Sequence, residues 1–267
     1  AYMTGSDQVW NCKFTKGDTN FLLKFAPKDS PRLSYGASFA SPSIPKEYEH
    51  IFKEELPKYS SILVREHSGV DIVKNLIGKN AEVVCDPTLL LTKTDYHVLA
   101  TKSKLFIPEP FILVYILDYM YNPYPKVYDI IRKVKKELGL KVVYIGTDAP
   151  DPMDNNYSYV GGQIGPLEFL WLMENTSFVI TTSFHGTAFA TIFHKPLFSV
   201  VQATENEDGR MQTLLRGLKQ EKSLVAYNKE LDVDLIHSDE IITKEERLDV
   251  IRMHSEELLV NSLKNIG

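Results

Sequence analysis

The chain has 267 residues, of which 43% are hydrophobic and 24% charged, a balance typical of a globular protein that can bury a core. This length predicts one or two domains. The net charge of −5 argues against a broad nucleic-acid surface, because a phosphate backbone needs a basic face. The longest apolar run, residues 111–117, is far shorter than the roughly 20 residues of a membrane-spanning helix.

The first part of the chain alternates short apolar runs with amphipathic stretches, which is typical of βα units in a mostly parallel sheet. The chain opens with Ala1 inside an apparent strand, so we expect an N-terminal segment of the natural protein to be missing. Polar, broken sequence at 92–110 predicts a boundary near residue 105. The elements expected before it are strands at 32–39, 60–64 and 82–85 and helices at 44–56 and 70–77.

The second part repeats this alternation, beginning with the apolar run at 111–117, which is typical of a strand buried on both faces. The other expected elements are strands at 141–146, 178–182 and 196–201 and helices at 126–138, 167–173, 186–194, 210–218 and 244–263. The chain is therefore predicted to be an α/β protein with two Rossmann-like units, residues 1–105 and 106–267. A ligand is expected in the crevice between them, at the carboxyl ends of the strands.

The most informative segment, residues 178–196, reads FVITTSFHGTAFATIFHKP. A hydrophobic strand ends in hydroxyl residues, and the stretch before the next strand is long enough for a helical crossover. The new helix would offer its N–H groups to an anion such as phosphate, with Ser183 as its cap. Gly186 would let a ligand approach the backbone, and His185 could exchange a proton near neutral pH. A histidine that only hydrogen-bonds within its loop is the alternative.

A Gly-Ser turn follows the apparent first strand and carries Ser6, Asp7 and Gln8. Such a turn can offer backbone N–H groups to a ligand, and the carboxylate of Asp7 can orient a sugar hydroxyl or a base. An ordinary βα turn with a local Asx hydrogen bond explains the same residues equally well.

Two arginines are candidates for binding an anionic group. Arg65 follows a predicted strand and can fork onto a carboxylate or phosphate, although pairing with Glu66 is an alternative. Arg210 begins a predicted helix after the acidic loop at 205–209, which could close over a ligand or simply be solvated. Asp86 repeats the position of Arg65 after the next strand, where a turn-capping role is the alternative.

Other common sites are not indicated. The histidines show no metal-ligand spacing, so no metal site is predicted. The chain lacks the glycine signatures of dinucleotide and nucleoside triphosphate sites and the G-x-S-x-G of esterases. Cys12 and Cys85 are expected to be buried thiols in a reducing compartment.

Taken in order, these motifs resemble those of the polysaccharide pyruvyl transferases. The motifs are GSDQVWN at 5–11, SYGAS at 34–38, Arg65–Glu66, DPTLL at 86–90, TSFHGT at 182–187 and Lys195–Pro196. The resemblance extends from residue 4 to about residue 218, and Ser-Phe-His-Gly-Thr is its most diagnostic part. It implies a glycosyltransferase-B-like pair of Rossmann domains, with the N-terminal unit incomplete because the strand and turn that precede the motifs in relatives are missing.

The resemblance also implies a reaction: transfer of a pyruvyl group from phosphoenolpyruvate to a sugar of an exopolysaccharide or cell-wall glycan precursor, forming a ketal and releasing phosphate. Some relatives have an arginine where this chain has Ser183, so the donor's charge must be met elsewhere. The implied site consists of His185 as the catalytic residue, the donor-binding residues Arg65, Ser183, Gly186, Thr187 and Arg210, and the acceptor-binding residues Ser6, Asp7 and Gln8.

The expected partners are phosphoenolpyruvate, as co-substrate with no further cofactor, and a sugar or lipid-linked oligosaccharide acceptor in the bacterial cytoplasm. Peripheral contact with the inner face of the membrane is left open, as are the oligomeric state and the acceptor sugar. Two other functions remain open: a nucleotide-sugar-dependent glycosyltransferase of the same architecture, and a non-catalytic glycan-binding protein.

Overall fold

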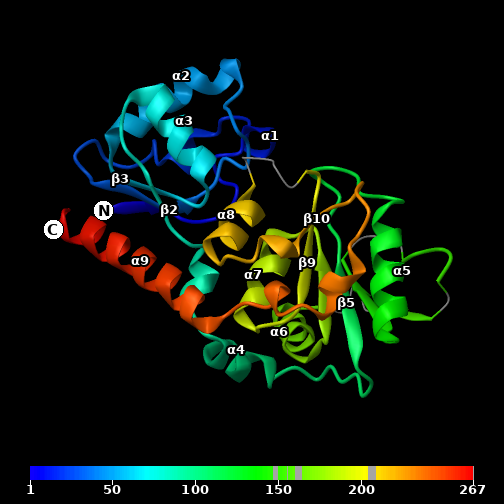
Figure 1. Cartoon of the computed structure of the whole chain (residues 1–267). Coiled ribbons are helices and arrows are strands. Elements are labelled where there is room, and N and C mark those ends of the chain that lie inside the picture. Colours follow the sequence, from blue (N-terminus) through cyan, green and yellow to red (C-terminus); the bar gives the residue numbers. More distant parts are fainter. Residues whose placement is uncertain (147–149, 155, 160–163, 204–208, 267) are drawn as a thin grey trace. The chain divides into compact units, whose positions relative to one another are not determined.

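The computed structural model describes residues 1–146, 150–154, 156–159, 164–203 and 209–266 (Figure 1). The chain forms two compact units, and it passes between them more than once. Unit 1 comprises Ala1–Leu90, Glu207–Leu214 and Asp249–Gly267, and unit 2 comprises Leu91–Asn206 and Leu215–Leu248. This division differs from the expected one in two ways: the first boundary follows Leu90 rather than residue 105, and most of the C-terminal helix belongs to unit 1.

Unit 1 is built on a four-stranded parallel sheet with the order β1-β2-β3-β4. The strands are β1 (Tyr2–Thr4), β2 (Arg32–Ala37), β3 (Tyr59–Val64) and β4 (Glu82–Val83). The helices between them are α1 (Cys12–Thr15), α2 (Lys46–Glu55) and α3 (His67–Ile77). Trp10, Phe39, Phe52 and Tyr59 lie in the core beneath these helices, each about 1% exposed.

The C-terminal helix α9 (Glu245–Lys264) completes unit 1 from residue 249 onward. The Ser255 hydroxyl accepts a hydrogen bond from the Cys85 amide at 2.9 Å, and Arg252 Nε donates to the Leu89 carbonyl at 2.7 Å. Leu258 and Leu259 pack against a small cluster of buried strand residues. These contacts join positions more than 160 residues apart, which is why an alternation pattern read along the chain does not assign this helix to unit 1.

Unit 2 contains a six-stranded parallel sheet with the order β10-β9-β8-β5-β6-β7. Its strands are β5 (Phe111–Tyr115), β6 (Lys141–Ile145), β7 (Tyr157–Tyr159), β8 (Phe178–Thr181), β9 (Leu197–Val201) and β10 (Leu224–Ala226). The chain builds the sheet outward from β5 to β7, then returns to the other side of β5 with β8. The strand order therefore reverses between β5 and β8. In doubly wound sheets, ligands bind outside the carboxyl ends of the strands at such a switch point.

The sheet of unit 2 is covered on both faces. Alternate residues of β5, Ile112 and Val114, share a buried cluster with α5. On the other face, Phe111 stacks on an aromatic ring of α6 and Tyr115 meets another edge-on. The helices are α4 (Lys93–Ala100), α5 (Val127–Leu138), α6 (Pro166–Asn175), α7 (Phe184–Ile192) and α8 (Arg210–Gly217), the last shared with unit 1. Short 3-10 turns lie at Thr19–Leu22, Leu56–Lys58, Pro87–Leu90, Glu221–Ser223, Val233–His237 and Asp239–Ile241.

Helix α4 lies in the segment expected to be a broken linker. It begins with a capping box: the Thr92 hydroxyl accepts from the Asp95 amide while the Asp95 carboxylate accepts from the Thr92 amide. This Thr-x-x-Asp pattern is a sequence signal for a helix start that the prediction missed. Within the described residues, no helix is both long enough and apolar enough to cross a bilayer.

Candidate functional site

The turn from β8 into α7 lies at the switch point of unit 2. Ser183 caps α7, as predicted: its Oγ accepts from the Gly186 amide at 3.2 Å. Thr181 Oγ1 donates to the Tyr115 carbonyl at 2.7 Å, and Thr182 Oγ1 donates to the Leu117 carbonyl at 2.8 Å. The hydroxyl residues thus tie the end of β8 to the segment at the end of β5, so the turn is held in place before any ligand arrives.

His185 lies in the first turn of α7, at the carboxyl end of the sheet. Its side chain is half-buried, and its ring meets that of Phe184 edge-on, with centroids 5.5 Å apart. The N-terminus of a helix favours negative charge, because its backbone N–H groups and its dipole point outward. An imidazole in this position can therefore exchange a proton with a bound anion.

Gly186 and Thr187 have structural roles that differ from the expected ones. A Cβ on Gly186 would overlap Thr181 Oγ1, so this position is packed rather than open to a ligand. Thr187 is fully buried, with Oγ1 donating to the Ser183 carbonyl at 3.1 Å and hydrogen-bonded to Ser199 Oγ at 2.8 Å. Both residues support the turn from within unit 2.

This packing makes Gly186→Ala a stability test. We expect the substitution to lower the free energy of unfolding by about 1–3 kcal/mol, because the new methyl group must displace the buried Thr181 side chain. Gly5→Ala is the control, since nothing lies within 4 Å of the position that its new Cβ would take. Urea denaturation of both variants measures the effect, and equal stability of the two would contradict it.

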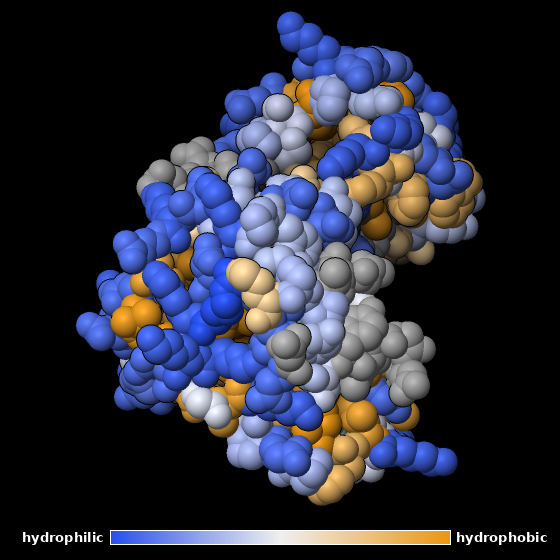
Figure 2. All heavy atoms as spheres, turned by 90° about the vertical axis from the view of Figure 1, so that its right-hand side faces the viewer, coloured by the Kyte–Doolittle hydropathy of each residue, from blue (hydrophilic) through white to orange (hydrophobic). Residues whose placement is uncertain are grey.

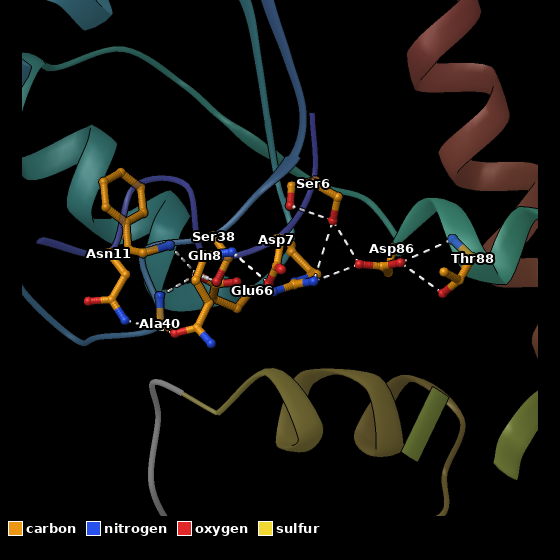
Figure 3. A network of polar contacts seen from close by, with 12 residues as sticks. Ser6, Asp7, Gln8, Asn11, Ser38, Ala40, Glu66, Asp86 and Thr88 are labelled. Atoms are coloured by element: carbon orange, nitrogen blue, oxygen red, sulfur yellow. Dashed lines mark hydrogen bonds and ion pairs between the residues drawn. The ribbon is translucent and has the colours of Figure 1, made fainter. Parts of the chain in front are cut away.

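Unit 1 carries a second polar cluster at the carboxyl edge of its own sheet (Figure 3). Arg65 follows β3, Asp86 follows β4, and Ser6 follows β1, so strand pairing brings the three together. Arg65 Nη1 lies 2.6 Å from Asp86 Oδ2, and both side chains are at most 2% exposed. The Ser6 hydroxyl donates to the same carboxylate oxygen at 2.7 Å, and the Thr88 amide and hydroxyl donate to the other at 3.0 and 2.8 Å.

Burial opposes the ionisation of Asp86, but the positive charge of Arg65 and the hydrogen bonds from Ser6 and Thr88 outweigh it. The pKa of Asp86 is therefore lowered from its ordinary value of 3.8. Asp86 is a charged partner for Arg65 as well as a turn cap. The predicted role of Arg65 in binding the donor stays a prediction, because much of its charge is already balanced within unit 1.

The three residues predicted for the acceptor lie together beside Arg65. Asp7 Oδ1 accepts from the Gln8 amide at 2.8 Å and lies 3.5 Å from Arg65 Nη2. Gln8 Oε1 accepts from Asn11 Nδ2 at 2.8 Å, which holds the side-chain amide of Gln8 near the start of α1. The Ser6 hydroxyl is engaged with Asp86, so it orders the cluster rather than facing outward.

Glu66, which the sequence offered only as a partner for Arg65, anchors the loop after β2. It is fully buried, and Oε1 accepts from Ser38 Oγ at 3.0 Å and from the amides of Phe39 and Ala40 at 2.8 and 3.2 Å. Burial raises the pKa of Glu66, against the opposing charges of Arg65 and Arg210. Arg210, 8% exposed at the start of α8, thus belongs to the electrostatic surroundings of unit 1. The preceding residues 204–208 lie outside the described residues.

The raised pKa makes Glu66→Gln a test of pH dependence. A group whose pKa is raised on folding contributes stability below its unfolded pKa, and this contribution is lost as pH rises through the folded pKa. We therefore expect Glu66→Gln to remove part of the stability loss that the wild type shows above pH 4.5. Urea denaturation from pH 5 to 8 measures this. A variant whose stability falls with pH as steeply as that of the wild type would contradict it.

Each unit also has a surface cavity. In unit 1, a cavity of about 220 Å³ lies beside α1 and is lined by Trp10, Asn11, Lys16, Phe39, Glu47 and Tyr48, among others. In unit 2, a cavity of about 450 Å³ lies beside α5 and is lined mainly by charged residues, including Lys126, Arg132 and Lys133. Figure 2 views the molecule from the side on which α5 lies and shows a largely hydrophilic face. Among the described residues, no His, Cys, Asp and Glu side chains gather as a metal site would require.

Among solved structures, an E. coli structure described as trehalose-6-phosphate bound with UDP-2-fluoro glucose is similar, with a TM-score of 0.51 and 11% identity over 93% of this chain and 76% of that one. UDP-GlcNAc 2-epimerase from Neisseria meningitidis bound to UDP-GlcNAc has a TM-score of 0.48 and 11% identity over 92% of this chain and 78% of that one. The first likeness, with the two parallel sheets, confirms the predicted glycosyltransferase-B-like α/β fold.

A search of the curated proteins found no match. The sequence model of a family described as polysaccharide pyruvyl transferase matches residues 1–202, which is most of the chain and includes both polar clusters described above. The chain therefore belongs to the polysaccharide pyruvyl transferase family.

Proposed function

We propose that the protein transfers a pyruvyl group from phosphoenolpyruvate to a sugar of an exopolysaccharide or cell-wall glycan precursor, forming a pyruvate ketal and releasing phosphate. Family membership supports a transferase acting on a polysaccharide. The observation that carries the proposal is the capped first turn of α7, which presents a half-buried imidazole at the switch point of a doubly wound sheet.

The donor matches the chemistry of this turn. Phosphoenolpyruvate carries a phosphate and a carboxylate, and the N-terminus of a helix such as α7 attracts negative charge. Ser183 and His185 are the side chains proposed to meet the phosphate, and Arg210 is the arginine proposed to add positive charge. Phosphoenolpyruvate is an activated co-substrate, so the reaction as proposed uses no further cofactor.

The reaction places specific demands on proton transfer. Carbon 3 of the donor must gain a proton before a sugar hydroxyl attacks carbon 2, and phosphate leaves as a second hydroxyl closes the ketal. Of the two hydroxyl protons lost by the acceptor, one balances the proton gained by carbon 3 and the other leaves with phosphate. We assign the proton delivered to carbon 3, or the hydrogen bond to the phosphate, to His185.

The acceptor is proposed to be a sugar or a lipid-linked oligosaccharide in the cytoplasm. For a lipid-linked acceptor, the protein would work at the inner face of the membrane. Co-flotation of the protein with vesicles that carry lipid-linked sugars, compared with plain vesicles, tests this part of the proposal separately. Equal recovery with both kinds of vesicle would leave a water-soluble acceptor as the better assignment.

A thermal-shift experiment separates the proposal from its main alternative. A ligand at 100 times its dissociation constant stabilises the folded state by about 2.7 kcal/mol, so phosphoenolpyruvate should raise the melting temperature. Stabilisation by UDP but not by phosphoenolpyruvate would favour a nucleotide-sugar-dependent glycosyltransferase.

Phosphate release is the decisive measurement. The protein is incubated with phosphoenolpyruvate and methyl hexosides, N-acetylhexosaminides, nucleotide-linked sugars or lipid-linked sugars, and free phosphate is followed. We expect release that depends on one class of acceptor. Binding of phosphoenolpyruvate without release for any acceptor would favour the non-catalytic glycan-binding function.

A further inference from the structure

Asp7 has a backbone conformation that is costly for a residue with a side chain. Its φ is +81°, in the left-handed region, where aspartate is tolerated better than most residues but still carries strain. The neighbouring strand holds it there: the Asp7 carbonyl accepts from the Ser38 amide at 3.0 Å, and Asp7 forms a parallel bridge with Ala37. Such strain is typically retained where a side chain has to be aimed.

The Asp7 carboxylate is held in one orientation but is open to solvent. Its Oδ1 accepts from the Gln8 amide and faces Arg65, whereas its Oδ2 makes no hydrogen bond within the described part of the chain. The side chain is 62% exposed, although it lies beside the buried Arg65–Asp86 pair. A carboxylate with one oxygen oriented and the other open can accept a hydrogen bond, and then a proton, from a hydroxyl group.

Asp7 shares the Arg65 guanidinium with a buried carboxylate. Arg65 has Asp86 as its close partner at 2.6 Å and Asp7 as its distant one at 3.5 Å, so one guanidinium serves two carboxylates. The pKa of Asp86 is lowered, so this carboxyl stays ionised. The three side chains together carry a net charge of −1, which suits a neutral hydroxyl ligand better than a phosphate or carboxylate. Figure 3 shows Asp7 and Asp86 in the same network of polar contacts.

We infer that Asp7 is the general base for the acceptor sugar and that Arg65 and Asp86 are its positioning residues. This inference rests on the proposed function. As the O–H bond of the attacking hydroxyl breaks, the proton passes to Asp7 Oδ2 and the oxygen's electron pair forms the bond to carbon 2 of phosphoenolpyruvate. Asp7 then returns the proton to solvent, which balances the proton delivered to carbon 3.

The test compares Asp7→Asn with Asp71→Asn, an exposed aspartate of α3 outside the cluster. Asparagine also tolerates a positive φ and can accept the hydrogen bond from Gln8, but it cannot take a proton. Phosphate release from phosphoenolpyruvate is measured with methyl hexosides and N-acetylhexosaminides across pH 5–9. We expect kcat of Asp7→Asn to fall by about 10²–10⁴-fold, with KM for phosphoenolpyruvate changed less than about threefold.

Asp7→Gly provides a readout that does not depend on activity. Glycine adopts a positive φ without strain, so its melting temperature should equal or exceed that of the wild type while phosphate release is lost. A melting temperature several degrees lower would show that Asp7 is structural and would overturn the inference.

The outcomes separate the inference from the proposed function. If the wild type releases phosphate and Asp7→Asn has the same kcat as the wild type, the role of Asp7 is overturned and the proposed function stands. Absence of phosphate release by the wild type with every acceptor class overturns the proposed function, and the role of Asp7 with it.

Discussion

Replacing His185 with alanine is expected to lower turnover by about 10²–10⁴-fold while the protein remains folded. The imidazole is half-buried in the first turn of α7, and the turn itself is held by Ser183 and Thr181 through hydrogen bonds that do not involve this ring. Removing it should therefore affect the reaction far more than the fold. Phosphate release from phosphoenolpyruvate measures the loss, and the melting temperature reports on folding.

His97→Ala is the matched control. His97 also belongs to unit 2, is 55% exposed, and pairs with Glu174 at 2.8 Å, an exposed contact that contributes little to stability. His185→Gln distinguishes two roles, because glutamine can hydrogen-bond a phosphate but cannot deliver a proton at neutral pH. Substantial activity in the glutamine variant would assign His185 to phosphate binding, whereas near-wild-type turnover in the alanine variant would remove it from the mechanism.

Local signals explain why the β8–α7 turn could be predicted. An apolar strand, a capping serine and a helix of small residues follow one another within 15 residues, so short-range rules place Ser183 and His185 correctly. For Gly186 the same rules gave an incomplete explanation, and its predicted role in donor binding stays a prediction. They allow a glycine to be explained by a ligand, whereas the actual neighbour is Thr181, five residues earlier and folded back against it.

The cluster of unit 1 could not be assembled from the sequence, because its members are far apart along the chain. Ser6 and Asp86 are 80 residues apart, and Arg65 stands between them with two possible partners. Only the strand order and register decide that Asp86 meets Arg65 while Glu66 turns inward to the loop at Ser38. The sequence places each of these residues at the end of a strand, but it does not show which residue pairs with which.

The Arg65–Asp86 pair provides the second large expected effect, this time on stability. Arg65→Ala should lower the free energy of unfolding by about 3–5 kcal/mol, because it leaves the ionised Asp86 buried at 2% exposure without its cation. Asp86→Ala removes the closer of the two carboxylates that face the buried guanidinium and should also be destabilising. The double variant should lose less than the sum of the two, since it buries no unpaired charge. Urea denaturation of the four proteins measures this coupling, and strict additivity would contradict it.

The lowered pKa of Asp86 adds a pH signature to the same cycle. A carboxyl whose pKa is depressed on folding contributes stability above its unfolded pKa, and this is lost as pH falls through the folded value. Wild-type stability should therefore decline more steeply below pH 3.8 than that of the double variant, which has no carboxyl at residue 86. If the wild type and the double variant lose stability equally as pH falls below 3.8, the charge of Asp86 does not contribute to the stability that the pair provides. Arg65→Lys keeps the positive charge but loses the two-pronged hydrogen bonding of the guanidinium. If this variant is as stable as the wild type but its KM for phosphoenolpyruvate is higher, the predicted role of Arg65 in donor binding is supported alongside its structural role.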